Sequence, residues 1–180
     1  MLEGRPKKIS SILIYGYGNP GRMDDGLGVQ FSEQMKSWVD RKHYINVDFE
    51  TNYQLNIEDA HTISEYDLVI FADATVEPID EYLLTYVEPS DAVNFSMHSV
   101  SPSYVVYLCQ SIYKKLPLTY LLHIKGYEWE FEERLTQMAQ SNLKKSLAFT
   151  HKLLRQLNVQ RSPNLFETRV SFAKKQSQLL

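Results

Sequence analysis

Strand-like and helix-like segments alternate along almost the whole chain, and this pattern restricts the fold more than any other feature of the sequence. Short apolar runs are separated by stretches that carry apolar residues at helical spacing. We predict strands over residues 10–15, 45–50, 67–72, 82–87 and 118–124, and helices over residues 26–40, 58–64, 101–114 and 136–157. Such alternation predicts an α/β fold with three layers, αβα, in which helices cover both faces of a mostly parallel, twisted sheet of about five strands.

The composition is that of one folded domain. The 180 residues fit a single core, and we assign residues 1–158 to this domain and residues 159–180 to a loosely ordered polar tail. A net charge of −3 does not favour a nucleic-acid partner, and no apolar run is long enough to span a membrane. The lone cysteine, Cys109, lies in an apolar run, which favours a buried thiol over a nucleophile. We expect a cytoplasmic monomer.

The first predicted strand leads into a glycine turn that carries two adjacent carboxylates. Gly16 and Gly18 break the apolar run, and Asp24 and Asp25 follow just before two further glycines. Glycines after a strand usually bring the backbone close to a ligand. Asp24 is a candidate cap for the next helix, and because one cap is enough, Asp25 is available for a functional role. The pattern indicates a cation site or a proton-transfer site at the edge of the sheet.

Three potential ligands each follow a predicted strand: Asp25, Glu58 and His98. If the sheet is parallel at those edges, the three side chains converge on one rim. Two carboxylates and one imidazole suit Zn, Ni, Mn or Fe with open coordination positions. The alternatives are a solvated first-turn acid for Glu58 and an ordinary loop residue for His98. Asp73 ends the most apolar strand, where either a turn role or a site role would fit.

Two other interpretations of the glycine turn are less satisfactory. Residues 16–21 match GxGxxG, but the two carboxylates would repel the diphosphate of a dinucleotide. Residues 18–21, GNPG, also resemble the start of peptidyl-tRNA hydrolases. That family continues with a Thr-Arg-His-Asn segment, whereas this chain continues RMDDG over residues 22–26, so the family's catalytic histidine has no counterpart here.

The glycine turn resembles that of the hydrogenase maturation endopeptidases, which remove a C-terminal extension from the large subunit of nickel–iron hydrogenases. The pattern is GYGN at residues 16–19 followed by DDGLG at residues 24–28. Four later segments agree with the same family in the same order, so the likeness covers residues 10–155. These segments are residues 53–58 (YQLNIE), 69–74 (VIFADA), 97–102 (MHSVSP) and 124–129 (IKGYEW).

The resemblance implies a site and a reaction. Carried over position by position, the family's metal-contacting and catalytic residues fall on Asp25, Glu58 and His98, with Asp59 as the alternative to Glu58 after a one-residue shift. Nickel would arrive with the large-subunit precursor, and the free protein would bind it weakly or not at all. The substrate metal could lower the pKa of the attacking water, or one carboxylate could act as the base. The alternative function is a nickel-sensing docking factor without peptidase activity.

Overall fold

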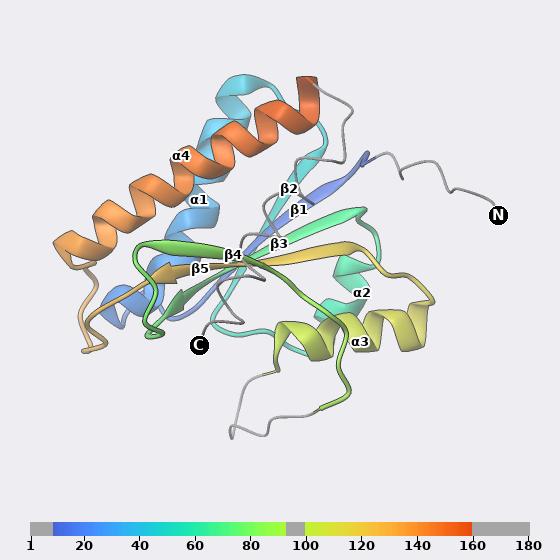
Figure 1. The fold of residues 1–180 in the computed structure, drawn as a ribbon, viewed down its shortest axis with the longest axis horizontal. Helices are drawn as coiled ribbons and strands as arrows, with labels where there is room; N and C mark the ends of the chain where they lie inside the picture. The colour runs from blue at the N-terminus through green and yellow to red at the C-terminus, as the bar shows by residue number, and fades with distance from the viewer. Residues whose placement is uncertain (1–8, 93–99, 160–180) are drawn as a thin grey trace.

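The structure is a computed structural model that describes residues 9–92 and 100–159, and strands and helices follow one another along the chain (Figure 1). The elements are β1 (Ile12–Tyr17), the short 3-10 helix η1 (Met23–Gly26), α1 (Leu27–Lys42), β2 (Val47–Asn52), α2 (Asp59–Ile63), β3 (Leu68–Thr75), β4 (Tyr82–Tyr86), α3 (Pro102–Tyr113), β5 (Leu118–Lys125) and α4 (Gln137–Val159). Every predicted strand and helix is present, with ends shifted by a few residues. The predicted tail lies almost wholly outside the described residues.

The five strands of the described chain form one sheet in the order β2-β1-β3-β5-β4. β2, β1, β3 and β5 are parallel, whereas β4 lies at the edge and runs antiparallel to β5. The α/β fold with a mostly parallel sheet is therefore confirmed. The predicted convergence of His98 with the other ligands assumed that the strand before it is parallel to the rest of the sheet. This assumption is wrong, because β4 is antiparallel and ends at the opposite rim from β1 and β3.

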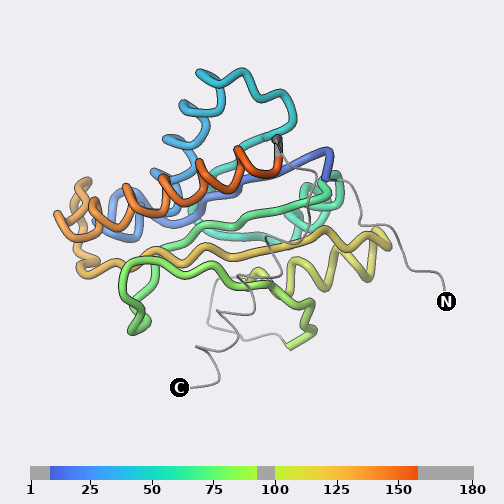
Figure 2. Tube along the Cα trace, turned by 45° about the horizontal axis from the view of Figure 1, so that its top comes forward, coloured from blue at the N-terminus to red at the C-terminus, as the bar shows by residue number. Residues whose placement is uncertain are grey.

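Helices cover both faces of the sheet (Figures 1 and 2). α1 and α4 pack on one face, in a core that contains Phe31 and Ile70, and α2 and α3 pack on the other, in a core that contains Phe71 and Val105. Neighbouring residues of β3 thus enter different cores, so the central strand is buried on both sides, as a parallel sheet requires. Cys109 is buried in the second core, and burial raises the pKa of its thiol.

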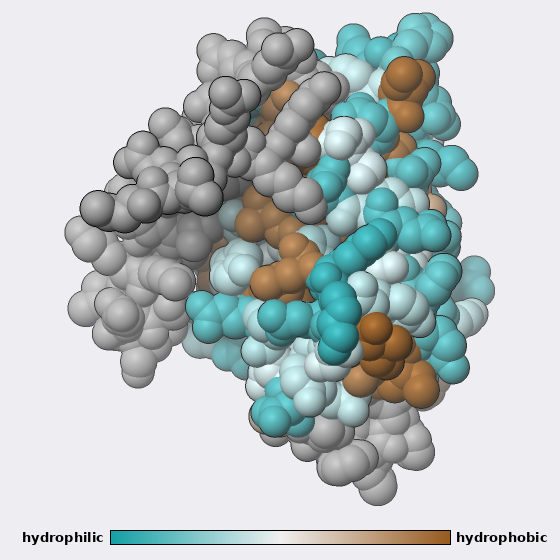
Figure 3. All heavy atoms as spheres, turned by 90° about the vertical axis from the view of Figure 1, so that its right-hand side faces the viewer, coloured by the Kyte–Doolittle hydropathy of each residue, from teal (hydrophilic) through white to brown (hydrophobic). Residues whose placement is uncertain are grey.

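The two ends of the sheet differ in character. Figure 3 views the end where the strands begin, and there the coloured apolar side chains form separate patches among polar ones. The opposite end, where the parallel strands finish, carries a cavity. None of the described helices combines the length and the apolar character that crossing a bilayer requires.

Candidate functional site

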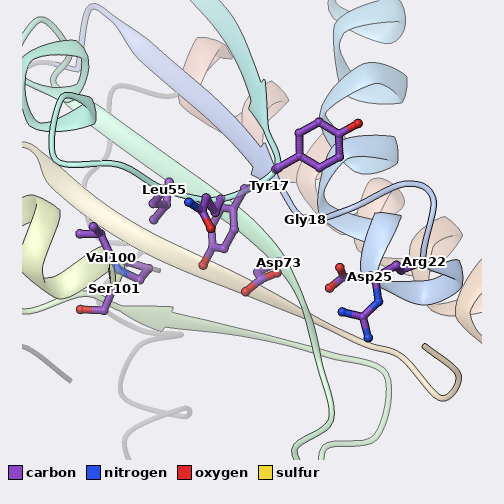
Figure 4. A pocket seen from close by; sticks show the side chains of 11 residues that line it. Tyr17, Gly18, Arg22, Asp25, Leu55, Asp73, Val100 and Ser101 are labelled. Carbon is purple, nitrogen blue, oxygen red and sulfur yellow. The ribbon is translucent and has the colours of Figure 1, made fainter. Parts of the chain in front are cut away.

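A cavity of about 510 Å³ lies where β1 and β3 end. From β1 the chain passes to β2 on one side, and it returns to β3 on the other side of β1, so the strand order reverses here. Such a reversal opens a crevice between the adjoining loops, and open parallel sheets bind ligands in this crevice. The walls come from the ends of β1 and β3, the η1 turn, the loop after β2 and the start of α3 (Figure 4).

Asp25 is the acid that the η1 turn presents to this cavity. Its Oδ2 accepts a hydrogen bond of 3.1 Å from the backbone N–H of Asn19. Gly18 makes this position possible, since its φ is +131° and a Cβ there would lie 2.0 Å from the carbonyl oxygen of Asp25. Only glycine tolerates both conditions. Gly18 therefore lets the chain approach its own backbone at Asp25 rather than a ligand, and this close approach fixes the position of Asp25.

Asp24, the preceding residue, has a structural role that differs from the predicted helix cap. Its carboxylate is fully buried, and it accepts hydrogen bonds from the backbone N–H groups of Tyr127 (2.8 Å), Glu128 (3.3 Å) and Thr136 (2.8 Å). The Thr136 hydroxyl donates a fourth bond of 2.9 Å. α1 begins without any side-chain cap, so the prediction of a cap was wrong. Asp24 ties the first loop to the segment between β5 and α4, and Asp25 remains as the acid at the cavity.

Asp73, near the end of β3, is the second acid that lines the cavity. In Figure 4 its carboxyl group and that of Asp25 point toward each other. Burial raises the pKa of Asp73 to about 7; hydrogen bonds from the Tyr17 hydroxyl and the Ala74 N–H oppose this rise, and the charge of Asp25 adds to it. Near neutral pH the Asp73 carboxyl group can therefore hold a proton, and it can give that proton up when a cation binds beside it.

Tyr17 links the end of β1 to this acid pair. Burial, the charge of Asp73 and the hydrogen bond to Asp73 together raise the pKa of Tyr17 well above its ordinary value. The phenol therefore stays protonated and donates to Asp73. This bond joins the two strands that flank the reversal of the sheet order.

Glu58 lies apart from the cavity. It precedes the first residue of α2, its side chain is exposed, and it is not among the described residues that line the cavity. Asp59 is buried, and its carboxylate accepts hydrogen bonds from the Tyr15 hydroxyl (2.9 Å) and the Asn56 N–H (2.7 Å). The loop after β2 passes the cavity at residues 53–55 and then turns away into α2. The predicted convergence of Glu58 on the rim is therefore not seen, and Asp59 is already used to fix the loop.

His98 lies outside the described residues, and its role stays a prediction. The description resumes two residues later, and Val100, Ser101 and Pro102 line the cavity. Ser101 is the N-cap of α3 and accepts a bond of 3.2 Å from the Tyr104 N–H, with proline at the first helical position. This confirms the predicted start of the helix. The described chain thus resumes in the cavity wall, two residues after His98 in the sequence.

Sequence reasoning left Asp73 undecided between a turn and a site. The signal that could have selected it is its position near the carboxyl end of the central strand, next to β1, where ligands bind in parallel sheets. Within residues 9–92 and 100–159, no group of three or more His, Cys, Asp or Glu residues could hold a metal ion. The described residues therefore contribute a pair of acids to the site and no third metal ligand.

Solved structures share this architecture. A [NiFe] hydrogenase maturation protease, HycI from Thermococcus kodakarensis, matches with a TM-score of 0.66 at 18% identity, covering 82% of this chain and 94% of that one. The hydrogenase maturating endopeptidase HybD from E. coli matches with a TM-score of 0.62 at 19% identity, covering 81% and 93%. The chain has the fold of the hydrogenase maturation proteases. A hydrogenase 2 maturation peptidase from a Thaumarchaeota archaeon also matches, with a TM-score of 0.58 at 18% identity, covering 80% and 97%.

The likeness to the maturation proteases lies in the fold. Neither a protein-family model nor the sequence of a curated protein matches this chain. The coverage is nevertheless almost complete on the side of the solved structures, at 93–97% for these three. The resemblance inferred from the glycine turn and the later motifs is therefore confirmed at the level of the three-dimensional fold.

Proposed function

We propose that this protein is an endopeptidase that removes the C-terminal extension of a nickel–iron hydrogenase large-subunit precursor in the cytoplasm, after nickel has been inserted. The observation that carries the proposal is the pair of acids, Asp25 and Asp73, which face each other across the cavity of a maturation-protease fold. Their mutual repulsion in the free protein is relieved when a divalent cation on the substrate docks between them.

Nickel belongs to the substrate in this proposal. Asp25 and Asp73 supply two oxygen donors, and the sequence resemblance adds His98 from the loop before α3. Glu58 was the second acid in that resemblance, but the geometry favours Asp73, because Asp73 lines the cavity and Glu58 is exposed outside it. Two acids without a closed ligand shell should bind free nickel only weakly. The substrate completes the shell.

This arrangement selects for the loaded precursor. A precursor without nickel brings no positive charge to the acids, so closing the cavity would desolvate them unpaired, at a cost of several kcal/mol. A nickel-bearing precursor avoids that cost. The protein therefore cleaves only after the metal has been inserted.

The hydrolytic step requires that a proton be taken from water. One of the two carboxylates can accept this proton as a general base. The substrate's nickel can assist by lowering the pKa of the attacking water. Both routes need Asp25 and Asp73 to be intact.

Single substitutions at the acids test the proposal. Nickel-loaded precursor is incubated with the wild type, Asp25→Asn, Asp73→Asn and Glu58→Gln, and the release of the C-terminal peptide is followed by mass spectrometry. We expect the first two substitutions to slow processing by at least about 100-fold, and Glu58→Gln to process like the wild type. Each change removes one carboxylate at nearly constant size, so Glu58→Gln is the matched control.

The other outcomes are equally informative. Normal processing by Asp25→Asn would contradict the proposal. Loss of processing in Glu58→Gln alone would restore Glu58 as the second acid. Stable binding of the precursor by the wild type, without cleavage, would identify the protein as a docking factor.

A further inference from the structure

The cavity that holds the two acids also holds a positive charge. Arg22 is the one cationic residue among the described residues that line the cavity. In Figure 4 its side chain and that of Asp25 are drawn on the same side of the cavity. The two groups are not hydrogen-bonded to one another, since Asp25 accepts from Asn19 and Arg22 donates to Trp129. The acids and the cation therefore stand as separate groups on the cavity wall.

Among the described residues, Arg22 uses little of its hydrogen-bonding capacity. Its Nη2 donates one long bond of 3.4 Å to the carbonyl oxygen of Trp129, and the guanidinium carbon lies 5.3 Å from the centre of the Phe131 ring. Its Nε is buried and has no hydrogen-bond partner in the part of the chain that the structure describes. An arginine offers five N–H donors, and a buried donor without an acceptor costs free energy. Such a group calls for an explanation, and a ligand oxygen provides one.

The backbone around Arg22 is held rigidly. Its N–H donates to the carbonyl oxygen of Asn19 (3.0 Å), and its own carbonyl oxygen accepts from the Asp25 N–H (3.1 Å). The next residue, Met23, donates to the carbonyl oxygen of Glu132 (2.8 Å). Arg22 and Asp25 thus share one turn, and the backbone that carries both side chains is held in place. A well-held backbone supports the positioning that a reaction centre needs.

We propose that Arg22 binds the carbonyl oxygen of the scissile peptide bond and stabilises the negative charge that develops on it. This inference rests on the proposed function, and it assigns to Arg22 a task that the acids cannot perform. Carboxylates can take up a proton, but they repel an oxyanion. A guanidinium donates hydrogen bonds to an oxyanion and carries the opposite charge.

The chemical step divides between the two kinds of group. Water attacks the carbonyl carbon, a C–O bond forms, the carbonyl π electrons move to oxygen, and one water proton passes to a carboxylate. Collapse of the tetrahedral intermediate breaks the C–N bond, and that proton is transferred to the leaving amine. The remaining proton leaves as the new C-terminus ionises. Arg22 faces the negative oxygen in the intermediate and again in the product carboxylate.

Steady-state kinetics on nickel-loaded precursor test this assignment. We expect Arg22→Gln to lower kcat by about 100- to 1,000-fold, the usual effect of losing an oxyanion donor, with KM nearly unchanged. Arg22→Lys keeps the charge and should retain part of the rate. Arg134→Gln is the control and should behave like the wild type, because Arg134 is an exposed arginine of the segment between β5 and α4 that pairs with Glu132.

Chemical rescue separates catalysis from a structural role. Arg22→Ala should regain activity when guanidinium is added at a concentration far below that which unfolds the protein, and its thermal unfolding should stay close to that of the wild type. Unchanged kcat in Arg22→Gln, or a raised KM at unchanged kcat, would overturn the assignment and leave the proposed function standing. A wild type that does not cleave the loaded precursor would overturn both.

Discussion

Asp24 and Asp25 are neighbours in the sequence, but their carboxylates lie in different environments. Asp24 is fully buried and accepts four hydrogen bonds from described residues, whereas Asp25 faces the cavity and accepts one from them. A one-residue step along the η1 turn therefore separates a residue that holds the fold together from a residue that can do chemistry.

Substitution should separate these two roles. Asp24→Asn replaces a charged acceptor with an amide that also brings donors, so some backbone N–H groups lose their partner and the free energy of unfolding should fall by about 2–4 kcal/mol. Asp25→Asn should change it by no more than about 0.5 kcal/mol, because an amide oxygen can still accept from the Asn19 N–H. Urea denaturation measures both. Equal losses of stability would show that the two acids have the same role.

Asp73 should make stability depend on pH. Its pKa of about 7 in the folded state lies above the ordinary 3.8, so the folded state binds the proton more tightly than the unfolded state. The free energy of unfolding then falls by up to about 4 kcal/mol as pH rises from about 4 to about 7, and it stays low at higher pH. The Asp73→Asn variant does not lose this stability, because an amide does not ionise. The substitution should therefore raise the melting temperature at pH of about 8 and change it much less at pH of about 4. A difference that does not vary with pH would refute the environment described for Asp73.

At the scale of elements, the glycines set how closely α1 approaches the ends of the strands. A Cβ at Gly28, in the first turn of α1, would lie 2.3 Å from the carbonyl oxygens of both Tyr17 and Ala72. The helix can therefore sit directly against β1 and β3 only without a side chain at this position. The same close packing holds together the ends of β1 and β3, beside which the acid pair lies.

Gly18 offers the sharpest test of this packing. Gly18→Ala meets both a φ of +131° and the Asp25 carbonyl oxygen, so it should cost at least about 1–3 kcal/mol in stability and should displace Asp25, slowing processing. Gly21→Ala is the matched control, because a Cβ there meets only the Asn19 side chain at 3.2 Å. Denaturation and processing assays on both variants measure the effect. Similar behaviour of the two variants would mean that the turn does not depend on Gly18.

The elements were predictable from the sequence because their signals are local. The apolar run of β3 and the Ser101-Pro102 start of α3 depend on neighbouring residues, and both were predicted correctly. The direction of β4 was not predictable, because it depends on pairing with β5, which is distant in the sequence. The path of the loop after β2, which leaves Glu58 outside the cavity, depends on the hydrogen bonds of Asp59 in the folded protein.

At the scale of the whole molecule, the sheet order brings the functional groups together. The reversal between β2, β1 and β3 places the η1 turn beside the end of β3, so Arg22, Asp25 and Asp73 meet at one cavity although they come from separate segments. The described residues thus supply a pair of acids and one cation at the position where open parallel sheets bind ligands. We expect this cavity to receive the nickel-bearing end of the hydrogenase precursor.

The intact mass of the precursor tests this account most directly. Nickel-loaded large-subunit precursor and the same precursor without nickel are each weighed by mass spectrometry before and after incubation with the protein. We predict that only the loaded form loses a C-terminal peptide, and that Asp25→Asn leaves it whole. Cleavage of both forms at the same rate, or of neither, would contradict the account.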